Sequence, residues 1–207
     1  FELIALTDHG TQCPTWNALF GTSCGAGPLL WSSTVRPNDL ALVGDFEHGA
    51  LSSASFGATI GFRCVRGGGK LPVPVGAGRF VGRSTGIVDR MTGLEWQHTP
   101  AATTGNWKTA LATCLNLGSG WRLPTVNELT SLVLFFSTVC VTWPPIFGAD
   151  CGATKVFWSS TPMTSLTESA YGVDFGSATV IGVSLFETSL ATRCVRAADV
   201  VLRGGGR

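Results

Sequence analysis

The sequence predicts an α+β fold with two helices on a small, twisted antiparallel sheet, stapled by disulfides and present in one and a half tandem copies. Two segments have the apolar spacing of helices, and several short β-branched segments have the composition of strands. An internal repeat relates the start of the chain to its end. Two helices packed on such a sheet form an α+β architecture.

The internal repeat covers residues 1–66, which correspond to the second half of residues 67–196. In each copy two cysteines lie eleven positions apart, and the tryptophan of a Trp-Ser-Ser-Thr motif follows the second cysteine by seven positions. Asp-Phe and Arg-Cys-Val-Arg motifs then follow in the same order, and the stretch between them differs by one residue. Such self-similarity marks a repeated structural unit. We therefore divide the chain into the C-terminal half of a first repeat (1–66), a Gly/Pro linker (67–78), a complete repeat (79–196) and a linker or tail (197–207).

The complete repeat begins with short strands at 80–81 and 87–88, followed by a turn that leads into another strand by Trp96. A helix is expected from Asn106, and Gly118 supplies its stop. One apolar face of this helix has the i, i+3, i+4, i+7, i+8 spacing: Trp107, Ala110, Leu111, Cys114 and Leu115.

A second helix is expected after Pro124, because Thr125 and Glu128 form a capping-box pattern. Its inner face consists of Leu129, Leu132, Val133 and Phe136. The rest of the repeat is rich in Gly, Ser and Thr with short β-branched runs, which we interpret as antiparallel strands. These strands are expected at 158–161, 170–175, 179–185 and 192–195.

The first copy begins inside the second helix, because Glu2 aligns with Glu128. The Thr cap and the whole preceding helix then have no counterpart in residues 1–66. A missing N-cap alone costs about 0.5–2 kcal/mol, and the loss of half a core costs more. We therefore expect a neighbour to cover the apolar surface of the first copy. Whether the 207 residues are a fragment of a longer repeat protein stays open at this point.

The composition excludes several classes of partner. Hydrophobic residues make up 44% and charged residues 13%, so the surface is either rich in Ser, Thr and Gly or partly covered by neighbours. The net charge of +1 gives no reason to expect nucleic acid or an anionic membrane. The apolar stretch 132–147 is too short and too polar to insert into a bilayer. Charge is uneven, however, since residues 67–126 carry six basic and two acidic side chains.

The seven cysteines favour disulfides over metal binding. They contain no Cys-x-x-Cys pattern, and the three histidines are dispersed, which argues against a zinc site. Paired, repeated spacings instead indicate disulfide bonds and an oxidising compartment outside the cell.

Five motifs in order resemble one known family: residues 92–97, 121–129, 157–161, 173–175 and 193–196. They are similar to the DUF1566 domain, the module at the C-terminus of the Legionella collagen-like adhesin. The resemblance covers 79–196 in full and 1–66 in part. It implies a C-type-lectin-like fold, related to that of formylglycine-generating enzymes, in an exported or surface-bound bacterial protein that often carries the module in tandem. The adhesin example binds sulfated polysaccharide.

The resemblance also implies disulfide pairs. Cys114 pairs with Cys194, which ties the first helix to the last strand. Two local loops are closed by Cys140 with Cys151 and by Cys13 with Cys24. Cys64 is then the odd cysteine, with a partner outside the chain or in another copy. Alternatively, Cys64 takes Cys114 and leaves Cys194 free.

Three motifs raise the question of catalysis or metal binding. A serine nucleophile in Trp-Ser-Ser-Thr needs a base, but no histidine has equivalent positions in both copies, so we expect a structural strand. Arg122 with Glu128 or Asp174 is expected to be a structural ion pair. Asp45 and Asp174 could ligate calcium, but the acidic cluster of such sites is missing. We therefore expect no enzyme activity, no catalytic residue, no resident metal and no cofactor.

Candidate contact residues lie in loops, which carry function on rigid scaffolds. Trp16 and Trp143 lie within the small disulfide loops, either as buried plugs or as exposed ligand platforms. Long loops that correspond to the lectin-like binding face contribute Lys155, Glu168, Tyr171 and Glu187.

Three functions remain open from the sequence alone. The first is a non-enzymatic extracellular surface protein of tandem lectin-like modules, which assembles into a fibre or layer in which neighbouring copies complete the half-domain. The second is an adhesin for sulfated glycans or a receptor, supported by the basic third of the chain. The third is an enzyme of the formylglycine-generating type, which would need a redox-active cysteine pair. The basic third contains Lys70, Arg79, Arg83, Arg90, Lys108 and Arg122.

Overall fold

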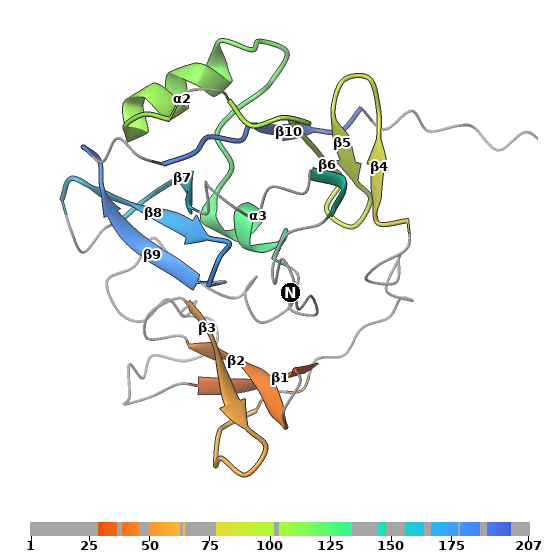
Figure 1. Cartoon of the computed structure of the whole chain (residues 1–207), viewed down its shortest axis with the longest axis vertical. Helices are drawn as coiled ribbons and strands as arrows, with labels where there is room; N and C mark the ends of the chain where they lie inside the picture. The colour runs from red at the N-terminus through yellow and green to blue at the C-terminus, as the bar shows by residue number, and fades with distance from the viewer. Residues whose placement is uncertain are drawn as a thin grey trace, which may run out of the picture.

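A computed structural model describes most of the chain after residue 28. The described residues are 29–36, 39–45, 50–62, 64, 78–101, 104–133, 145–147, 156–163, 167–177, 179–186 and 190–199. Within these ranges the chain forms small antiparallel sheets and two short α-helices, as an α+β architecture requires (Figure 1). We call residues 29–64 the first unit and residues 78–199 the second unit.

The second unit begins with a four-stranded antiparallel sheet. Its strands are β4 (Phe80–Gly82), β5 (Ile87–Asp89), β6 (Leu94–Trp96) and β10 (Val195–Ala197), in the order β10-β6-β5-β4. The three early strands confirm the prediction. The predicted bounds of the last strand, 192–195, are wrong, because only residues from Val195 on pair with β6.

The two helices begin at the predicted residues. Helix α2 (Trp107–Leu115) has Asn106 as its N-cap, whose side chain accepts a hydrogen bond from Thr109 N–H. Helix α3 (Val126–Thr130) has the predicted capping box of Thr125 and Glu128. One predicted apolar position of α2 is wrong, since Leu115 is 65% exposed.

Helix α3 is shorter than predicted. It ends at Thr130, and Leu132 and Val133 are buried in the turn that follows it. Phe136 lies outside the described residues. A short 3-10 turn, η2 (Pro145–Phe147), places Phe147 in the core beside Phe80.

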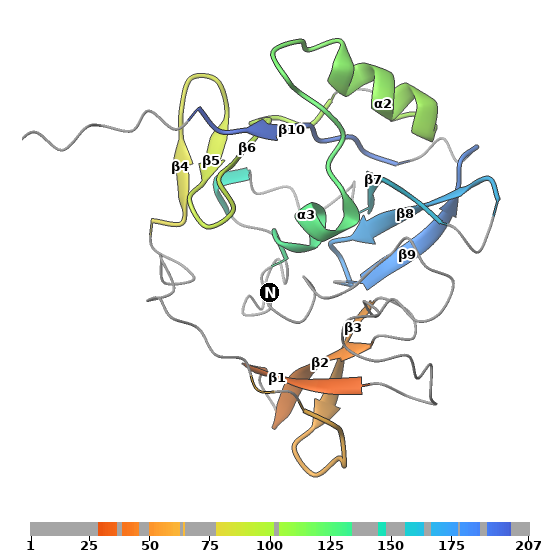
Figure 2. The same ribbon diagram turned by 180° about the vertical axis from the view of Figure 1, so that it is seen from behind.

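A second sheet of this unit has the order β7-β8-β9: β7 (Val156–Pro162), β8 (Ser169–Asp174) and β9 (Thr179–Ser184). Helix α3 packs against β7 and β8, and α2 packs against β7 (Figure 2). One core cluster joins α3 to both sheets, and a smaller one lies under α2 around Trp158 and Cys194. Burial of these apolar side chains is the main stabilising contribution to the unit.

The first unit contains a three-stranded antiparallel sheet of its own. Its strands are β1 (Leu29–Arg36), β2 (Leu40–Asp45) and β3 (Ala50–Ser55), in the order β1-β2-β3. This sheet lies below the second unit in Figure 1, where β3 approaches β9.

The β1-β2-β3 and β7-β8-β9 sheets share their register. Leu29 pairs with Asp45 as Val156 pairs with Asp174, and the first pairing shifts after Trp31 as the second does after Trp158. The pairing of β2 with β3 matches that of β8 with β9 along its whole length. The two segments aligned by the sequence repeat therefore form the same ladder.

The turn before the middle strand is also the same in both sheets. Asp39 and Glu168 occupy equivalent positions and both have a positive φ, 56° and 69°. Phe56 N–H donates to Asp39 O (3.1 Å), and Leu185 N–H donates to Glu168 O (2.8 Å). A non-glycine residue with positive φ is uncommon, so this shared conformation is a specific likeness between the two units.

Candidate functional site

After β9, a segment of the second unit runs back alongside β7, the first strand of its own sheet. Residues 190–194, the return segment of this unit, form a parallel bridge between Ala191 and Phe157. Trp158 N–H donates to Ala191 O (3.0 Å), and Ala191 N–H donates to Val156 O (3.0 Å). One side of the return segment is thus bonded to β7.

The other side of the return segment is bonded to residues 97–114, which we call the cover segment. Three backbone N–H groups of the cover segment donate to alternate carbonyl oxygens of the return segment. The bonds run from Gln97 to Cys194 (2.9 Å), from Ala101 to Thr192 (2.9 Å) and from Gly105 to Leu190 (3.4 Å). The return segment is therefore enclosed on both sides.

Two tryptophans lock the cover segment to the sheet. Trp158 is fully buried, and its Nε1–H donates to Gly105 O (2.8 Å). Trp107, at the start of α2, donates from Nε1 to Ser159 O (2.7 Å) and from its backbone N–H to Leu185 O (3.3 Å). Each indole thus satisfies a backbone carbonyl of the opposite segment, as buried indoles require.

A disulfide joins the cover segment to the return segment. The Sγ atoms of Cys114 in α2 and Cys194 are bonded, and both residues are fully buried. This is the pair that the family resemblance implies, and it leaves Cys64 as a free, exposed thiol. The alternative pairing of Cys64 with Cys114 is therefore wrong.

The first unit has one part of this arrangement, the bonding of a return segment to the first strand of its sheet. Its return segment is residues 60–64, in which Gly61 forms a parallel bridge with Leu30 and accepts a hydrogen bond from Trp31 N–H (2.8 Å). These contacts match those of Ala191 with Phe157 and Trp158. The bond between this segment and the first strand of its sheet is therefore common to both units.

Among the residues that the structure describes, the first unit has no counterpart of the cover segment. Phe62 is 74% exposed, whereas the equivalent Thr192 is buried. Phe56 is 53% exposed, whereas the equivalent Leu185 packs against the cluster under α2. No hydrogen bond within the described ranges reaches the carbonyl oxygens of Ile60, Phe62 or Cys64. We call Phe56, Ile60, Phe62 and Cys64 the open edge of the first unit.

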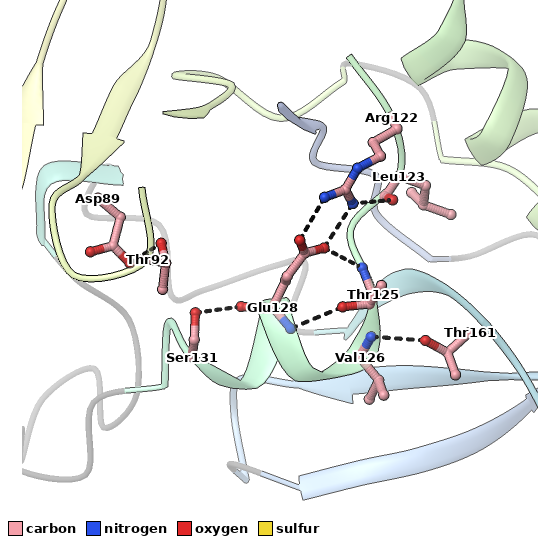
Figure 3. A network of polar contacts seen from close by, with 9 residues as sticks. All are labelled: Asp89, Thr92, Arg122, Leu123, Thr125, Val126, Glu128, Ser131 and Thr161. Carbon is pink, nitrogen blue, oxygen red and sulfur yellow. Dashed lines mark hydrogen bonds and ion pairs between the residues drawn. The ribbon is translucent and has the colours of Figure 1, made fainter. Parts of the chain in front are cut away.

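A polar network at the start of α3 is centred on Glu128 (Figure 3). Arg122 donates to both carboxylate oxygens of Glu128, at 2.8 and 2.6 Å, and Thr125 N–H donates to Oε2 at 2.7 Å. Burial by itself would raise the pKa of Glu128. The hydrogen bonds from Arg122 and Thr125 and the charge of Arg122 outweigh burial and lower this pKa below its usual value. The pair therefore holds the start of α3 and is not poised for proton transfer.

Arg122 is held in the charged state by the same contact. Its hydrogen bond to Glu128 raises the pKa of Arg122, against the opposing effect of burial. The other predicted partner, Asp174, is engaged elsewhere, since it accepts hydrogen bonds from Gly176 N–H (2.7 Å) and Ser177 Oγ (2.8 Å). The expected structural ion pair is thus formed with Glu128.

The remaining buried cations are also structural. Arg79 donates to both oxygens of Asp89 (2.9 and 2.6 Å) and to Ser131 O (2.8 Å), in an ion pair closed to solvent. Arg193 donates to Gln97 O and His98 O, and its guanidinium lies 4.9 Å from the Phe147 ring centre. Burial lowers the pKa of Arg193 to about 9, so it stays charged at neutral pH.

Residues 85–196 match the family model of the Lcl C-terminal domain, which is more than half of the chain. The chain belongs to the Lcl C-terminal domain family. This family indicates a surface-exposed or adhesin-like protein, and a disulfide fits an oxidising compartment. No curated protein matches the chain at a significant level.

The matched Lcl C-terminal domain contains the cover segment, both helices and the return segment of the second unit. The first unit lies outside the match. None of the helices in the described part of the chain is long and apolar enough to cross a membrane. The same part of the chain contains no group of three or more His, Cys, Asp or Glu side chains placed to hold a metal ion.

The Trp-Ser-Ser-Thr motif of the Lcl domain is structural. Ser159 is fully buried, and its Oγ donates to Tyr171 O (2.6 Å) and accepts from Thr161 N–H (3.2 Å). Both hydrogen-bonding functions of the Ser159 hydroxyl are thus directed at the backbone.

The predicted contact residues have different outcomes. Glu168 is exposed in the turn before β8. The predicted loop position of Tyr171 is wrong, because this residue lies in β8 with 9% of its surface exposed, and burial raises its pKa above 10. The other predicted contact residues and the local disulfides lie outside the described residues: Trp16, Trp143, Lys155, Glu187, Cys13, Cys24, Cys140 and Cys151.

In the basic third of the chain, few positively charged side chains are available to bind a ligand. Arg79 is buried and Arg122 is paired with Glu128, so neither supplies a free cation for a ligand. Arg83, Arg90 and Lys108 are exposed. Lys70 lies outside the described residues.

The sequence prediction missed the open edge as a site. The signal was present in the repeat alignment, since Phe62 aligns with Thr192 and thus places a large apolar side chain where the complete unit has a small one. This difference indicates an exposed apolar site only once the equivalent position, Thr192, is known to be buried.

Proposed function

We propose that this protein is a non-enzymatic, extracellular surface protein of tandem modules with a C-type-lectin-like fold, in which neighbouring copies complete the first module and assemble into a fibre or layer. The observation that carries this proposal is the difference between the two return segments. Both are bonded to the first strand of their sheet, but only residues 190–194 are covered on the other side among the residues that the structure describes. An exposed edge and exposed apolar side chains favour pairing with a neighbour that supplies the missing side.

The chemistry of the described polar groups supports a structural role. Ser159 is buried and bonded to backbone, and the carboxylate of Glu128 is held in an ion pair at a helix cap. No step of this proposal needs a cofactor or a metal. The free thiol of Cys64 is assigned to an intermolecular contact.

Assembly is tested on full-length protein purified under oxidising conditions. We expect size-exclusion chromatography and electron microscopy to show particles that grow with concentration, because a contact between different surfaces of successive copies does not close on itself. Small monodisperse particles at every concentration would contradict assembly into a fibre or layer.

A second candidate function is binding of sulfated glycans. It is favoured by the exposed side chains of Arg83, Arg90 and Lys108 and by the adhesin-like character of the family. A glycan array tests it, with the desulfated form of each glycan as the matched control. We expect binding that falls as salt rises, because contacts between separated surface charges are screened. Equal binding of sulfated and desulfated glycans would exclude this function.

A further inference from the structure

We propose that the open edge of the first unit binds the backbone donors and the helix of the cover segment of a further Lcl-type module, and that docking forms a disulfide with Cys64. This inference rests on the proposed function and specifies its partner. The incoming segment has the chemistry of residues 97–114: backbone N–H donors at every fourth residue (97, 101 and 105), a Gly-Asn-Trp helix start and a cysteine two turns later.

The backbone of the open edge has the spacing that such a segment needs. In the second unit the cover segment donates to the carbonyl oxygens of residues 190, 192 and 194. The equivalent residues of the first unit are Ile60, Phe62 and Cys64. Alternate carbonyls of an extended chain point to one side. They present one row of acceptors, which matches the row that the cover segment bonds in the second unit through residues 97, 101 and 105.

The apolar side chains of the open edge lie where the second unit is covered. The positions of Phe56 and Phe62 correspond to Leu185 and Thr192, which lie beneath the cover segment and α2. Two exposed phenylalanines at those positions favour an occupant that buries them.

Cys64 identifies the part of the partner that must lie next to it. The equivalent Cys194 is bonded to Cys114, and their Cα atoms are 5.3 Å apart. A cover segment that docks on the first unit in the same register brings its own cysteine to Cys64 at a comparable distance. Two thiols then become one disulfide, and they lose two electrons and two protons to a small-molecule disulfide, which is reduced to two thiols.

The cover segment of this chain is already engaged. It is held by the Cys114–Cys194 disulfide, by hydrogen bonds to its own return segment and by the two indole contacts of Trp107 and Trp158. The described residues contain two return segments and one cover segment. Transfer of that segment to the first unit would only expose the second, so the occupant has to come from another module.

A synthetic peptide of residues 94–117 serves as the probe. It is incubated with the full chain in a glutathione redox buffer, and covalent products are mapped by mass spectrometry. We expect a one-to-one product in which peptide Cys114 is bonded to Cys64. A peptide with the same composition, with its cysteine at the same position and the other residues scrambled, is expected to give at least about tenfold less product, because docking depends on register.

Two variants separate docking from thiol reactivity. Phe62→Thr introduces the residue of the second unit, and we expect about tenfold less product, since a large apolar contact is lost. Cys64→Ser is expected to abolish the covalent product while fluorescence anisotropy of a labelled peptide still reports binding. The inference is overturned by equal labelling with the scrambled peptide, by attachment at Cys194, by dimers joined through two Cys64 residues in preference to the peptide product, or by no product at all.

The outcome is distinguishable from failure of the proposed function. A specific product at Cys64 without large particles of native protein would support the docking site and exclude the fibre or layer. Large particles without a specific product would support assembly and exclude this docking site.

Discussion

The first and second units contain the same three-stranded sheet and differ in what covers the segment that returns beside it. In both units the strand register, the shift after the tryptophan and the positive-φ turn are the same. In the second unit the returning cysteine is buried in a disulfide, and in the first it is exposed. The comparison teaches that local sequence is sufficient to define the sheet and its return segment, whereas their burial depends on a separate segment.

The cover segment contributes several kinds of interaction at once. It makes four backbone N–H hydrogen bonds, two indole contacts and one disulfide bond with the rest of the second unit. Paired variants at equivalent positions of the two units therefore measure what the cover segment adds.

The largest difference in stability loss between the two units is expected for variants of Trp158 and Trp31. Trp158→Ala removes a fully buried side chain and its bond to Gly105, so we expect a loss of about 3–5 kcal/mol in the stability of the second unit. Trp31 is only partly buried, and Trp31→Ala is expected to cost less. Hydrogen exchange of β8 and β2, followed by mass spectrometry, measures the two units separately. Equal losses would show that the cover segment adds little.

The cysteine pair gives the next largest effect. Cys194→Ser opens a disulfide between residues 80 positions apart, and we expect a loss of about 2–4 kcal/mol. Cys64→Ser is the matched control, with an expected change within about 0.5 kcal/mol because its thiol is free and exposed. Thermal unfolding followed by circular dichroism compares the two. A comparable loss for Cys64→Ser would mean that Cys64 already stabilises the first unit.

The cap of α3 gives a smaller effect. Thr125→Ala removes the side chain that accepts from Glu128 N–H, and we expect a loss of about 1 kcal/mol. Ser52→Ala, at an exposed position of β3, is a suitable control and is expected to change stability by less than about 0.5 kcal/mol. Urea unfolding at neutral pH measures both variants. No change for Thr125→Ala would show that the capping box is not needed beside the sheet.

The smallest effect is a pH dependence of the second unit. The folded pKa of Glu128 is lower than its usual value of 4.5, so the stability it contributes is complete above about pH 4.5 and is lost as the pH falls through the folded pKa. Because Arg122 is partly exposed, solvent screening limits this contribution to about 0.5 kcal/mol. In the Glu128→Gln variant, we expect the urea midpoint of the second unit to fall less steeply below pH 4.5 than in the unchanged protein. An unchanged slope would show that other carboxyl groups cause the decrease.

The elements that depend on neighbouring residues were predictable from the sequence. Asn106 and Thr125 mark the helix starts because a cap bonds to residues two or three positions later. The repeat alignment also predicted which segments form the same ladder. Strand ends were less predictable, since Thr192 and Cys194 accept single hydrogen bonds from Ala101 and Gln97 and form no continuous pairing with a neighbouring strand.

The errors concern burial, which depends on distant segments. The strand predicted at 170–175 is confirmed by β8, but the assignment of Tyr171 as an accessible contact residue is wrong, because residues 170–173 are buried on both faces of that strand. Leu115 continues the apolar pattern of α2 but lies beyond the part that packs on the sheet. The ion pair between Arg79 and Asp89 was missed because a hairpin, and not a helical spacing, brings the two residues together.

The chain enters the second unit through β4 and leaves it through β10, the two edge strands of one sheet. A mechanical pull along the polypeptide is therefore transmitted across this sheet. Its strand pairings are short, so they would separate one after another. Arg79 anchors the entrance to the end of α3, and the covalent bond at Cys194 anchors the exit to α2. Tension at the entrance therefore reaches α3 through Arg79, and tension at the exit reaches α2 through the disulfide.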